Sequence, residues 1–437
     1  MTSSRPTRSW TAFLLYDLLL LLAGLLLVPF VLYRLIRSRD FRRNLPARFG
    51  YVQKLAPAPG RVLLHGVSVG EVKALKPLVL EFQKHYPERE LVIASSTPTG
   101  ISSARQLYSD LTVVAYPLDL PGAGRRFLAR VKPSIVVLAE LEIWPNFLRS
   151  CDGLGIEVAI VNGRITERSM AGYRRVQRWL PQFDRIALYG VQNQRYAERF
   201  QMLSVPDDRI VVTGNLKYDN LPTASDDIAF EKSVWSRWQK HSEMAVWAST
   251  HEPEEQQLLQ AWMKEPASAE AVAILVPRHP RRSGTLMQML QREIGQRPLL
   301  RLSEIRDLER LPAGAVVLVD AFGELEAIYR AVRCAFLGGS LIEHGGQNML
   351  EAAAVGVPVV VGPHTENFLE EVSKLEAGQG LKVVEDASKV VEWLILWLQN
   401  PEIAADCGRN AAKTLESERG AAQSTILALQ QSGLLAG

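Results

Sequence analysis

One stretch in the last third of the sequence combines glycine pairs with polar side chains in a way that suits a nucleotide ligand. An apolar run that predicts a buried strand, Cys334–Leu337, ends at the first pair, Gly338–Gly339. The second pair, Gly345–Gly346, opens a pattern that predicts a helix from about residue 347 to residue 355. Glycines at the start of a helix let a phosphate approach backbone N–H groups, and a carboxylate one turn later, at Glu351, suits a ribose diol. One pair would indicate an ordinary strand–turn–helix, whereas two pairs with polar residues between them indicate a binding loop.

A second candidate is the carboxylate Glu71, which follows the predicted strand Val62–Leu64 through a turn containing Ser68 and Gly70. In open α/β sheets, ligands bind outside the carboxyl ends of the strands, which is where this turn lies. There Glu71 would be able to take a proton from a substrate. A glutamate in the first turn of a helix is also a common cap, stabilised by the helix dipole. Spacing alone favours the cap.

Two further carboxylates and a lysine follow other predicted strands. Glu140 and Glu142 come directly after the strand Ile135–Ala139. They share a face only if that strand continues, so one of the two is expected to reach a substrate. Lys217 follows the strand Ile210–Thr213, where it would meet negative charge on a donor or acceptor. On its own, this position favours a solvated loop lysine.

The second half of the chain contains polar turns of the same kind. Arg278 and His279 end the predicted strand Val272–Val276. The planar fork of an arginine suits phosphate, and histidine is a switchable donor. A turn over residues 320–325 is expected to line a base or ribose, and a turn over residues 250–252 is similar, with a less defined role.

Short apolar runs that alternate with helical lengths must position these side chains. This alternation is the signature of a parallel, doubly wound sheet. A chain of 437 residues is long for one core, and the polar stretch 220–227 separates two such series. The predicted strands are 62–64, 91–94, 113–115, 135–139, 158–161, 186–189 and 210–213, followed by 245–248, 272–276, 316–319, 335–337 and 359–361.

We therefore predict an α/β fold with two Rossmann-like, doubly wound domains facing across a cleft, which is the GT-B architecture. The expected boundaries are a membrane anchor and basic juxtamembrane segment over residues 1–50, a first domain over 51–219, a linker over 220–244 and a second domain over 245–437.

The segment Thr11–Tyr33 is the one membrane-length apolar run in the sequence. A helix needs ~20 such residues to cross the hydrocarbon core, and the run exceeds the ~7–15 residues usual for the apolar part of a signal peptide. Asp17 near its start is tolerable at the interface. The segment predicts a single membrane anchor that either crosses the bilayer or lies half-embedded. By the positive-inside rule, the arginines after it put the following domains in the cytoplasm and predict contact with an anionic membrane surface: Arg34, Arg37, Arg39, Arg42, Arg43 and Arg48, against Arg5 and Arg8 before it.

Composition excludes several classes of protein. Lys and Arg number 50 against 47 Asp and Glu, so no global basic field favours nucleic acid. Three scattered cysteines, Cys151, Cys334 and Cys407, argue against a disulfide framework or a zinc site. The sequence has neither a Walker A motif nor the D-x-D motif by which many nucleotide-sugar enzymes hold a divalent metal. We therefore expect neither a metal nor a cofactor.

A cluster of arginines follows the predicted strand 158–161. A solvated face and a site for the phosphates of an acceptor explain it equally well. The cluster comprises Arg164, Arg168, Arg174, Arg175 and Arg178.

Five ordered motifs closely resemble those of the Kdo transferases, which move 3-deoxy-manno-octulosonic acid (Kdo) from its CMP-activated form onto the lipid A precursor. They are HGVSVGEV (65–72), ELEIWPN (140–146), GNLKYD (214–219), PRHP (277–280) and the stretch 334–364, and together they extend over nearly the whole chain. The resemblance implies an inverting, metal-independent transferase that uses CMP-Kdo and a lipid A precursor. It also implies a location on the cytoplasmic face of the bacterial inner membrane.

The resemblance implies roles for individual residues. Glu71 would be the general base. Glu142, favoured over Glu140 because it stands beside Trp144, would support the transition state together with Lys217. The second domain would bind CMP through Arg278, His279, Phe322, Gly323, Glu324, Asn348, Met349, Leu350 and Glu351.

Two alternatives stay open at this point. One is another nucleotide-sugar-dependent GT-B lipid glycosyltransferase, which a comparison of CMP and UDP binding would distinguish. The other is a non-catalytic membrane scaffold with a degenerate transferase fold, which would bind no CMP. The sequence motifs determine neither the number of Kdo units transferred nor the oligomeric state. We also expect removal of residues 1–33 to release the protein without abolishing turnover of a solubilised acceptor.

Overall fold

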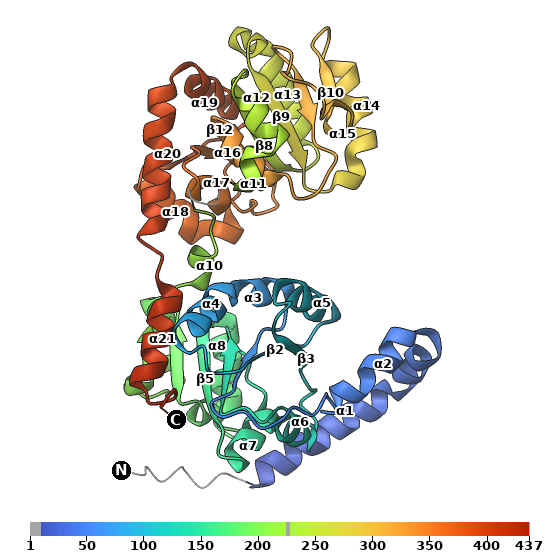
Figure 1. Cartoon of the computed structure of the whole chain (residues 1–437), viewed down its shortest axis with the longest axis vertical. Coiled ribbons are helices and arrows are strands. Elements are labelled where there is room, and N and C mark those ends of the chain that lie inside the picture. The colour runs from blue at the N-terminus through green and yellow to red at the C-terminus, as the bar shows by residue number, and fades with distance from the viewer. Residues whose placement is uncertain (1–9, 224–227, 437) are drawn as a thin grey trace. The chain divides into compact units, whose positions relative to one another are not determined.

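The computed structural model describes residues 10–223 and 228–436. The chain forms two compact units (Figure 1). Unit 1 contains the N-terminal part up to Asn220 together with the segment that starts at Arg419, and unit 2 runs from Leu221 to Glu418. Each unit holds one seven-stranded sheet in which all paired strands are parallel. The predicted α/β fold with two doubly wound sheets is therefore confirmed.

The sheet of unit 1 consists of β1 (Val62–His65), β2 (Leu91–Ser95), β3 (Thr112–Ala115), β4 (Ile135–Ala139), β5 (Glu157–Gly163), β6 (Leu188–Val191) and β7 (Ile210–Val212). Their order is β3-β2-β1-β4-β5-β6-β7, so the chain winds outward from β1 in both directions. All seven predicted strands form. Strand β6 begins at Leu188 rather than Ile186, because a 3-10 turn over Phe183–Arg185 precedes it.

Helices cover both faces of this sheet: α3 (Val69–Ala74), α4 (Lys76–His85), α5 (Pro98–Leu107), α6 (Ala123–Val131), α7 (Pro145–Gly153), α8 (Glu167–Gln177), α9 (Gln194–Gln201) and α10 (Leu216–Asp219). Successive side chains of a strand point to opposite faces. Leu63 accordingly belongs to a buried cluster with Phe127 of α6, and Leu64 to a separate one with Phe82 of α4. These two apolar layers fix the strands whose carboxyl ends carry the candidate residues.

The sheet of unit 2 consists of β8 (Met244–Thr250), β9 (Val272–Pro277), β10 (Leu299–Arg301), β11 (Val316–Leu318), β12 (Cys334–Leu337), β13 (Val359–Val361) and β14 (Leu381–Val383). Their order is β10-β11-β9-β8-β12-β13-β14. The sequence predicts the five inner strands but not β10 and β14, the two edge strands. Both have three residues, carry a charged side chain (Arg301 and Lys382) and are only partly buried. They therefore lack the continuous apolar run of an inner strand.

Residues 220–244, predicted to be a linker, are largely folded against unit 2. Trp235 and Trp238 of α12 are fully buried, with their rings 5.1 Å apart in an edge-to-face arrangement. Residues 224–227 of the predicted linker lie outside the described residues. The helices of unit 2 are α11 (Ile228–Glu231), α12 (Val234–Gln239), α13 (Glu254–Lys264), α14 (Ser283–Glu293), α15 (Leu302–Ile305), α16 (Leu325–Ala331), α17 (Leu350–Ala354), α18 (Leu369–Ala377), α19 (Ala387–Gln399) and α20 (Pro401–Glu416).

The C-terminal helix α21 (Ala421–Gln431) packs with unit 1, although the sequence predicts that it belongs to the second domain. The carboxylate of Asp219 accepts hydrogen bonds from the N–H groups of Gly420 and Ala422, both at 2.7 Å. Leu429 joins the same buried cluster as Leu64. A helical pattern in the sequence shows that one face of the helix is apolar, but it does not show which core that face covers. The predicted second domain, residues 245–437, therefore differs from unit 2, which ends at Glu418.

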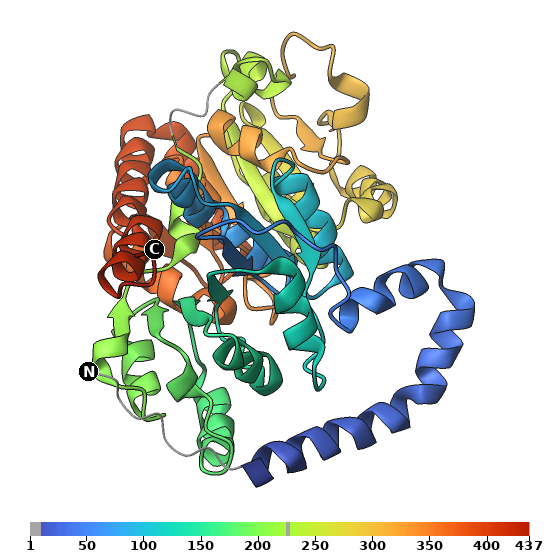
Figure 2. The same ribbon diagram turned by 60° about the horizontal axis from the view of Figure 1, so that its bottom comes forward.

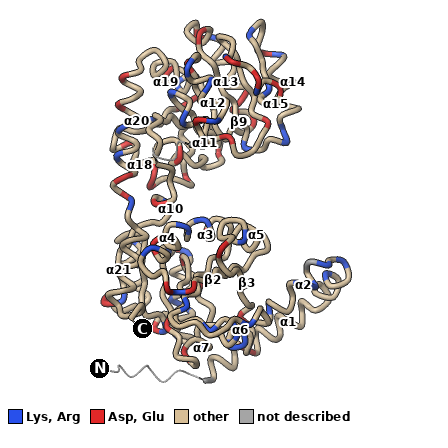
Figure 3. Tube along the Cα trace, in the orientation of Figure 1, with Lys and Arg blue, Asp and Glu red and all other residues tan. Residues whose placement is uncertain are grey.

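Helix α1 (Trp10–Arg37) is the one helix in the described part of the chain that is long and apolar enough to cross a membrane. None of the residues in its most apolar stretch is buried. It leads into α2 (Arg39–Arg48), which Figure 2 shows from a second side. In Figure 3 the blue of Lys and Arg marks much of the trace of α2. Arg5 and Arg8 lie outside the described residues.

Candidate active site

Glu71 lies beyond the carboxyl end of β1, in the first turn of α3. Its Oε2 accepts a hydrogen bond from the N–H of Val67 at 2.9 Å, and its Oε1 accepts one from Oγ of Ser68 at 2.9 Å. Ser68 Oγ in turn accepts a hydrogen bond from the Glu71 N–H at 3.3 Å. This reciprocal arrangement is a variant of the capping box, in which the carboxylate binds the N–H before the N-cap residue and the N-cap hydroxyl. Each carboxylate oxygen has about two lone-pair directions, so Glu71 caps α3 and keeps the capacity to accept a substrate proton.

Glu140 directly follows β4 in a left-handed backbone conformation, with a φ of 60°. Its Oε2 accepts a hydrogen bond from Nε of Arg164 at 2.8 Å. Burial raises the pKa of Glu140, and the positive charge of Arg164 opposes that shift. The partner of Glu140 is thus the positively charged side chain of Arg164, which directly follows the neighbouring strand β5.

Glu142 accepts a hydrogen bond from Nε1 of Trp144 at 2.6 Å. Burial raises the pKa of Glu142 to about 7, the hydrogen bond from Trp144 opposes the shift, and the negative charges of Glu71 and Glu140 add to it. A carboxyl group with a pKa near the working pH is suited to acid–base chemistry. Glu71, Glu140 and Glu142 therefore form one electrostatically coupled group at the carboxyl ends of β1 and β4.

Lys217 lies in α10, just after β7. Its N–H donates to Oδ1 of Asn215 at 3.1 Å, and its Nζ stands 5.1 Å from the centroid of the Tyr218 ring. The carboxyl ends of parallel strands share one edge of a sheet. The structure therefore places Lys217 on the same sheet edge as Glu71 and Glu142.

The motif that contains Glu71 begins with a histidine that supports the turn. His65 is fully buried, and its ring stacks on Tyr116 with centroids 3.7 Å apart. Its Nδ1 lies 3.1 Å from the carbonyl oxygen of Ala94. Burial lowers the pKa of His65 to about 3, so the ring is neutral and packs as part of the core.

Three histidines converge at the carboxyl ends of β8, β9 and β12 in unit 2. The ring centroid of His251 lies 4.3 Å from that of His344 and 6.2 Å from that of His279. Burial lowers the pKa of His251 to about 4, and the neighbouring histidines and arginines lower it further. His279 and Arg278 are exposed at the end of β9, where the sequence predicts phosphate binding. Within residues 10–223 and 228–436, no group of three or more His, Cys, Asp or Glu side chains is arranged to hold a metal ion.

His251 and His344 are the members of this cluster to which sequence reasoning assigns no defined role. The signal available was the position of His251 just after a predicted strand, as for His279, and that of His344 in the glycine-rich loop after another strand. What the sequence does not reveal is that three such strand ends lie side by side.

The first glycine pair of the loop after β12 serves packing. Glu254, which is fully buried, accepts hydrogen bonds at 2.7–3.1 Å from the three successive N–H groups of residues 339–341. A Cβ atom at Gly338 would lie 2.5 Å from Cα of Thr250. The loop therefore closes tightly over the start of α13. The protein's own carboxylate occupies these N–H groups, so they are not free to receive the anion of a ligand.

The second glycine pair shapes an irregular turn before α17. Gly345 and Gly346 have φ values of 88° and 80°, and a Cβ atom at Gly345 would lie 2.4 Å from Nδ2 of Asn367. The helix begins at Leu350, three residues later than predicted. The reason is that Oδ1 of Asn348 accepts a hydrogen bond from the N–H of Leu350 at 3.1 Å.

The predicted donor-binding residues of this segment differ in accessibility. The polar side chains of Asn348 and Glu351 are adjacent, with Nδ2 of Asn348 3.3 Å from Oε1 of Glu351. Met349 and Leu350 are 0% and 3% exposed. Neither of these two side chains is therefore available to a ligand.

The turn after β11 presents an aromatic ring. Phe322 is 79% exposed, and the φ of 82° at Gly323 turns the chain beside it. Glu324 accepts hydrogen bonds from Nη2 of Arg306 at 2.6 Å and from Nε1 of Trp235 at 2.8 Å. Both oxygens of Glu324 thus tie this turn to other elements of unit 2, while Phe322 stays accessible.

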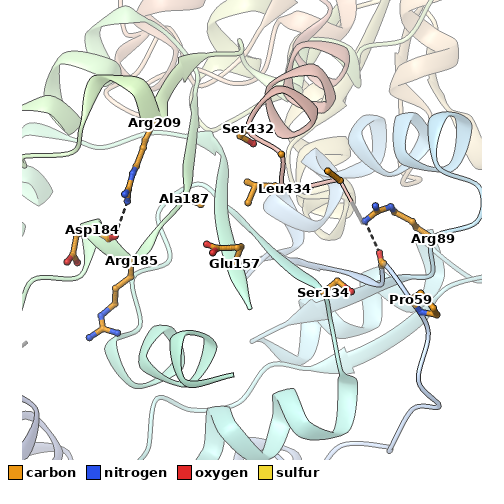
Figure 4. A pocket seen from close by; sticks show the side chains of 13 residues that line it. Pro59, Arg89, Ser134, Glu157, Asp184, Arg185, Ala187, Arg209, Ser432 and Leu434 are labelled. Carbon is orange, nitrogen blue, oxygen red and sulfur yellow. Dashed lines mark hydrogen bonds between the residues drawn. The ribbon is translucent and has the colours of Figure 1, made fainter. Parts of the chain in front are cut away.

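A cavity of about 860 Å³ lies at the opposite edge of the unit 1 sheet (Figure 4). Its lining includes Ser134 and Ala187, which precede β4 and β6. Arg209 at its wall donates a hydrogen bond to the main-chain oxygen of Asp184 at 3.0 Å. Because parallel sheets bind ligands at the carboxyl ends of their strands, this cavity is not the candidate site.

Comparison with known proteins adds to this geometry. Residues 43–220 match the family model for 3-deoxy-D-manno-octulosonic-acid transferase (kdotransferase), and residues 312–414 match that for glycosyl transferases group 1. A 3-deoxy-D-manno-octulosonic acid transferase of Haemophilus influenzae is 32% identical over 93% of this chain and 96% of its own length. One of Chlamydophila psittaci is 29% identical over 96% of each chain.

Among solved structures, UDP-GlcNAc 2-epimerase from Neisseria meningitidis matches with a TM-score of 0.59 at 14% identity, over 85% of this chain and 100% of its own. At that identity the likeness concerns the fold alone. An epimerase thus shares the fold, so the chemistry must be argued from the sequence relatives and from the site.

Proposed function

Because this chain belongs to the 3-deoxy-D-manno-octulosonic acid (Kdo) transferase family, we propose that it transfers Kdo from CMP-Kdo to the lipid A precursor in lipopolysaccharide synthesis. The observation that carries the proposal is the placement of the motif residues. Glu71, Glu142 and Lys217 lie along the carboxyl edge of one sheet, and Arg278 and His279 lie along the carboxyl edge of the other.

In the proposed reaction, Glu71 accepts the proton of an acceptor hydroxyl while that oxygen attacks the anomeric carbon of Kdo. The bond from the anomeric carbon to the CMP phosphate breaks as the new bond forms on the opposite face, so the configuration inverts. The hydrogen bonds from Val67 and Ser68 orient the Glu71 carboxylate for this step. Glu142 and Lys217 supply a tuned carboxyl group and a positive charge to the transition state.

The departing CMP takes the bonding electron pair onto its phosphate. Arg278 and His279, both exposed at the end of β9, stabilise this negative charge without a metal ion. Glu351, beside Asn348, accepts hydrogen bonds from the ribose hydroxyls. The exposed ring of Phe322 offers a stacking surface for the cytosine base.

We place the reaction at the cytoplasmic face of the inner membrane. The apolar helix α1 and the basic helix α2 that follows it support this location.

The test combines purified full-length protein, CMP-Kdo and a detergent-solubilised lipid A precursor, with mass analysis of the lipid product. A product heavier by one or more Kdo units is expected, and the mass also counts the units. Turnover of a UDP-sugar in place of CMP-Kdo, or failure to bind CMP, would refute the proposal.

A further inference from the structure

The first turns of α1 are part of unit 1. Ala12 and Phe13 are buried, at 9% and 6% exposure, in an apolar cluster with Leu180. The guanidinium of Arg149 lies 4.7 Å from the centroid of the Phe13 ring. Later in the helix the side chains are open, as at Leu25, which is 66% exposed. The helix is thus docked at its start and exposed along the rest of its length.

Two polar side chains of the same turns secure this docking. Oη of Tyr16 donates a hydrogen bond to Oδ2 of Asp119 at 2.8 Å. Oδ1 of Asp17 accepts one from Nδ2 of Asn146 at 2.8 Å, and its Oδ2 forms an ion pair with Nη2 of Arg149 at 3.0 Å. An aspartate is unfavourable in a membrane segment, and here both of its oxygens have partners in the folded unit.

The residues that receive these contacts either lie in the first turns of α7, as Asn146 and Arg149 do, or cap that helix, as Asp119 does. Asp119 accepts hydrogen bonds from the N–H groups of Asn146 at 3.1 Å and Phe147 at 2.8 Å, so its carboxylate caps the positive end of the helix. The side chain of Asn146 is 2% exposed and also donates to the main-chain oxygen of Asp119 at 2.9 Å. Glu142 and Trp144, joined by their own hydrogen bond, immediately precede this cap.

We infer that Tyr16 and Asp17 are positioning residues for the transfer reaction. Through Asp119 and Asn146 they fix the first turn of α7, and with it the segment over residues 140–144 that carries Glu142. The inference rests on the proposed function, because the role of Glu142 belongs to that proposal. A catalytic group displaced by ~1 Å lowers rates on the order of 100-fold.

A positioning role of Tyr16 and Asp17 lowers the turnover expected of a protein that lacks residues 1–33. The sequence alone predicts that such a protein keeps turning over a solubilised acceptor. Its loss of Tyr16 and Asp17 leads us to expect a lower kcat even in detergent.

The decisive variant is Asp17→Leu in the full-length protein, assayed in detergent micelles with saturating CMP-Kdo and acceptor. Leucine makes α1 more apolar, so membrane association is strengthened. If α1 is only a tether, turnover is unchanged or higher. If Asp17 positions the Glu142 segment, kcat falls by about tenfold or more while KM for CMP-Kdo stays the same. Leu22→Ala on the exposed part of α1 is the matched control and should keep the wild-type kcat.

A second variant, Tyr16→Phe, removes only the hydroxyl group that contacts Asp119 and should lower kcat several-fold. It decides the question if Asp17→Leu fails to fold. Wild-type kcat in Tyr16→Phe and in any folded Asp17→Leu protein overturns the inference.

Hydrogen–deuterium exchange gives a readout that does not depend on the sugar transferred. In the Asp17→Leu protein, amides of residues 140–150 should exchange faster than in wild type, because the side chains of Asn146 and Arg149 in the first turns of α7 lose their contacts with Asp17. Exchange in unit 2 should not change. A wild-type protein that transfers no Kdo refutes the proposed function, and unchanged exchange over residues 140–150 refutes the positioning role.

Discussion

Replacement of Glu71 by glutamine separates the two roles that this side chain can play. A capping box accepts Gln as well as Glu at this position. The amide Oε1 can accept the hydrogen bond of the Val67 N–H, and its Nε2 can donate to Oγ of Ser68, so both local partners are kept. The amide cannot accept a proton from the acceptor hydroxyl. The variant therefore removes the chemistry and spares most of the cap.

The expected change in stability is small. Loss of the charge in the first turn of α3 costs about 0.3–1 kcal/mol of dipole interaction. Relief of the repulsion that Glu71 exerts on Glu140 and Glu142 offsets part of that cost. For a unit of this size, 1 kcal/mol corresponds to about 2–4 °C in Tm. By contrast, kcat should fall by about 10²–10⁴-fold, which is the usual contribution of a general base.

Three measurements are needed: kcat at saturating acceptor, CMP affinity by calorimetry, and Tm by circular dichroism. CMP affinity should be nearly unchanged, because CMP is proposed to bind unit 2. Glu81→Gln in α4 is the matched control, since the carboxylate of Glu81 pairs with two exposed side chains, His85 at 3.1 Å and Lys84 at 3.9 Å. Turnover of the Glu71→Gln variant within a few-fold of wild type would show that Glu71 is only a cap, and Glu142→Gln would be tested next. Loss of CMP binding or of folding would make Glu71 structural.

Other predictions address the donor site, the metal and the tuned carboxyl group. Glu351→Ala should weaken CMP binding by about 1.5–3 kcal/mol in calorimetry, with the exposed Glu343→Ala as control, and equal affinities would remove Glu351 from the site. Activity with pre-made CMP-Kdo should survive EDTA because Arg278 and His279 neutralise the phosphate, and a strict requirement for magnesium would contradict this assignment. The raised pKa of Glu142 means that the folded state binds its proton more tightly, so this carboxyl group costs stability progressively as pH rises from its ordinary pKa to about 7. The Tm of Glu142→Gln relative to wild type should therefore increase between about pH 4 and about pH 8, and a pH-independent difference would show that burial does not control this group.

Local patterns in the sequence predict the elements and the edge at which the candidate residues meet. The inner strands are apolar runs, and Glu71, Glu142 and Lys217 each follow one of them. Because the strands are parallel, these positions must share an edge, although the residues are far apart in sequence. The same reasoning places Arg278 and His279 at the corresponding edge of the second sheet.

Contacts between distant segments could not be predicted in this way. Asp17 reads as an unfavourable charge in a membrane helix, because its partner Arg149 is 132 residues away. Helix α21 has an apolar face, but only the contacts of Asp219 with its first turn show that it returns to unit 1. The edge strands β10 and β14 are short and partly polar because they are paired on one side only.

Glu71 and Glu254 show why burial, rather than position in the sequence, determines which carboxylate is available for chemistry. Each glutamate lies in the first turn of a helix that follows a parallel strand. Glu71 is half-buried, and its carboxylate accepts one hydrogen bond from the main-chain N–H of Val67 and one from the hydroxyl of Ser68. Glu254 is covered by the loop after β12 and accepts four main-chain hydrogen bonds, from His251 and from residues 339–341. Gly338 permits that cover, since a side chain there would collide with Thr250. The glycine pair that suggests ligand binding therefore encloses the carboxylate of Glu254, whereas Glu71 stays partly exposed and can meet a substrate.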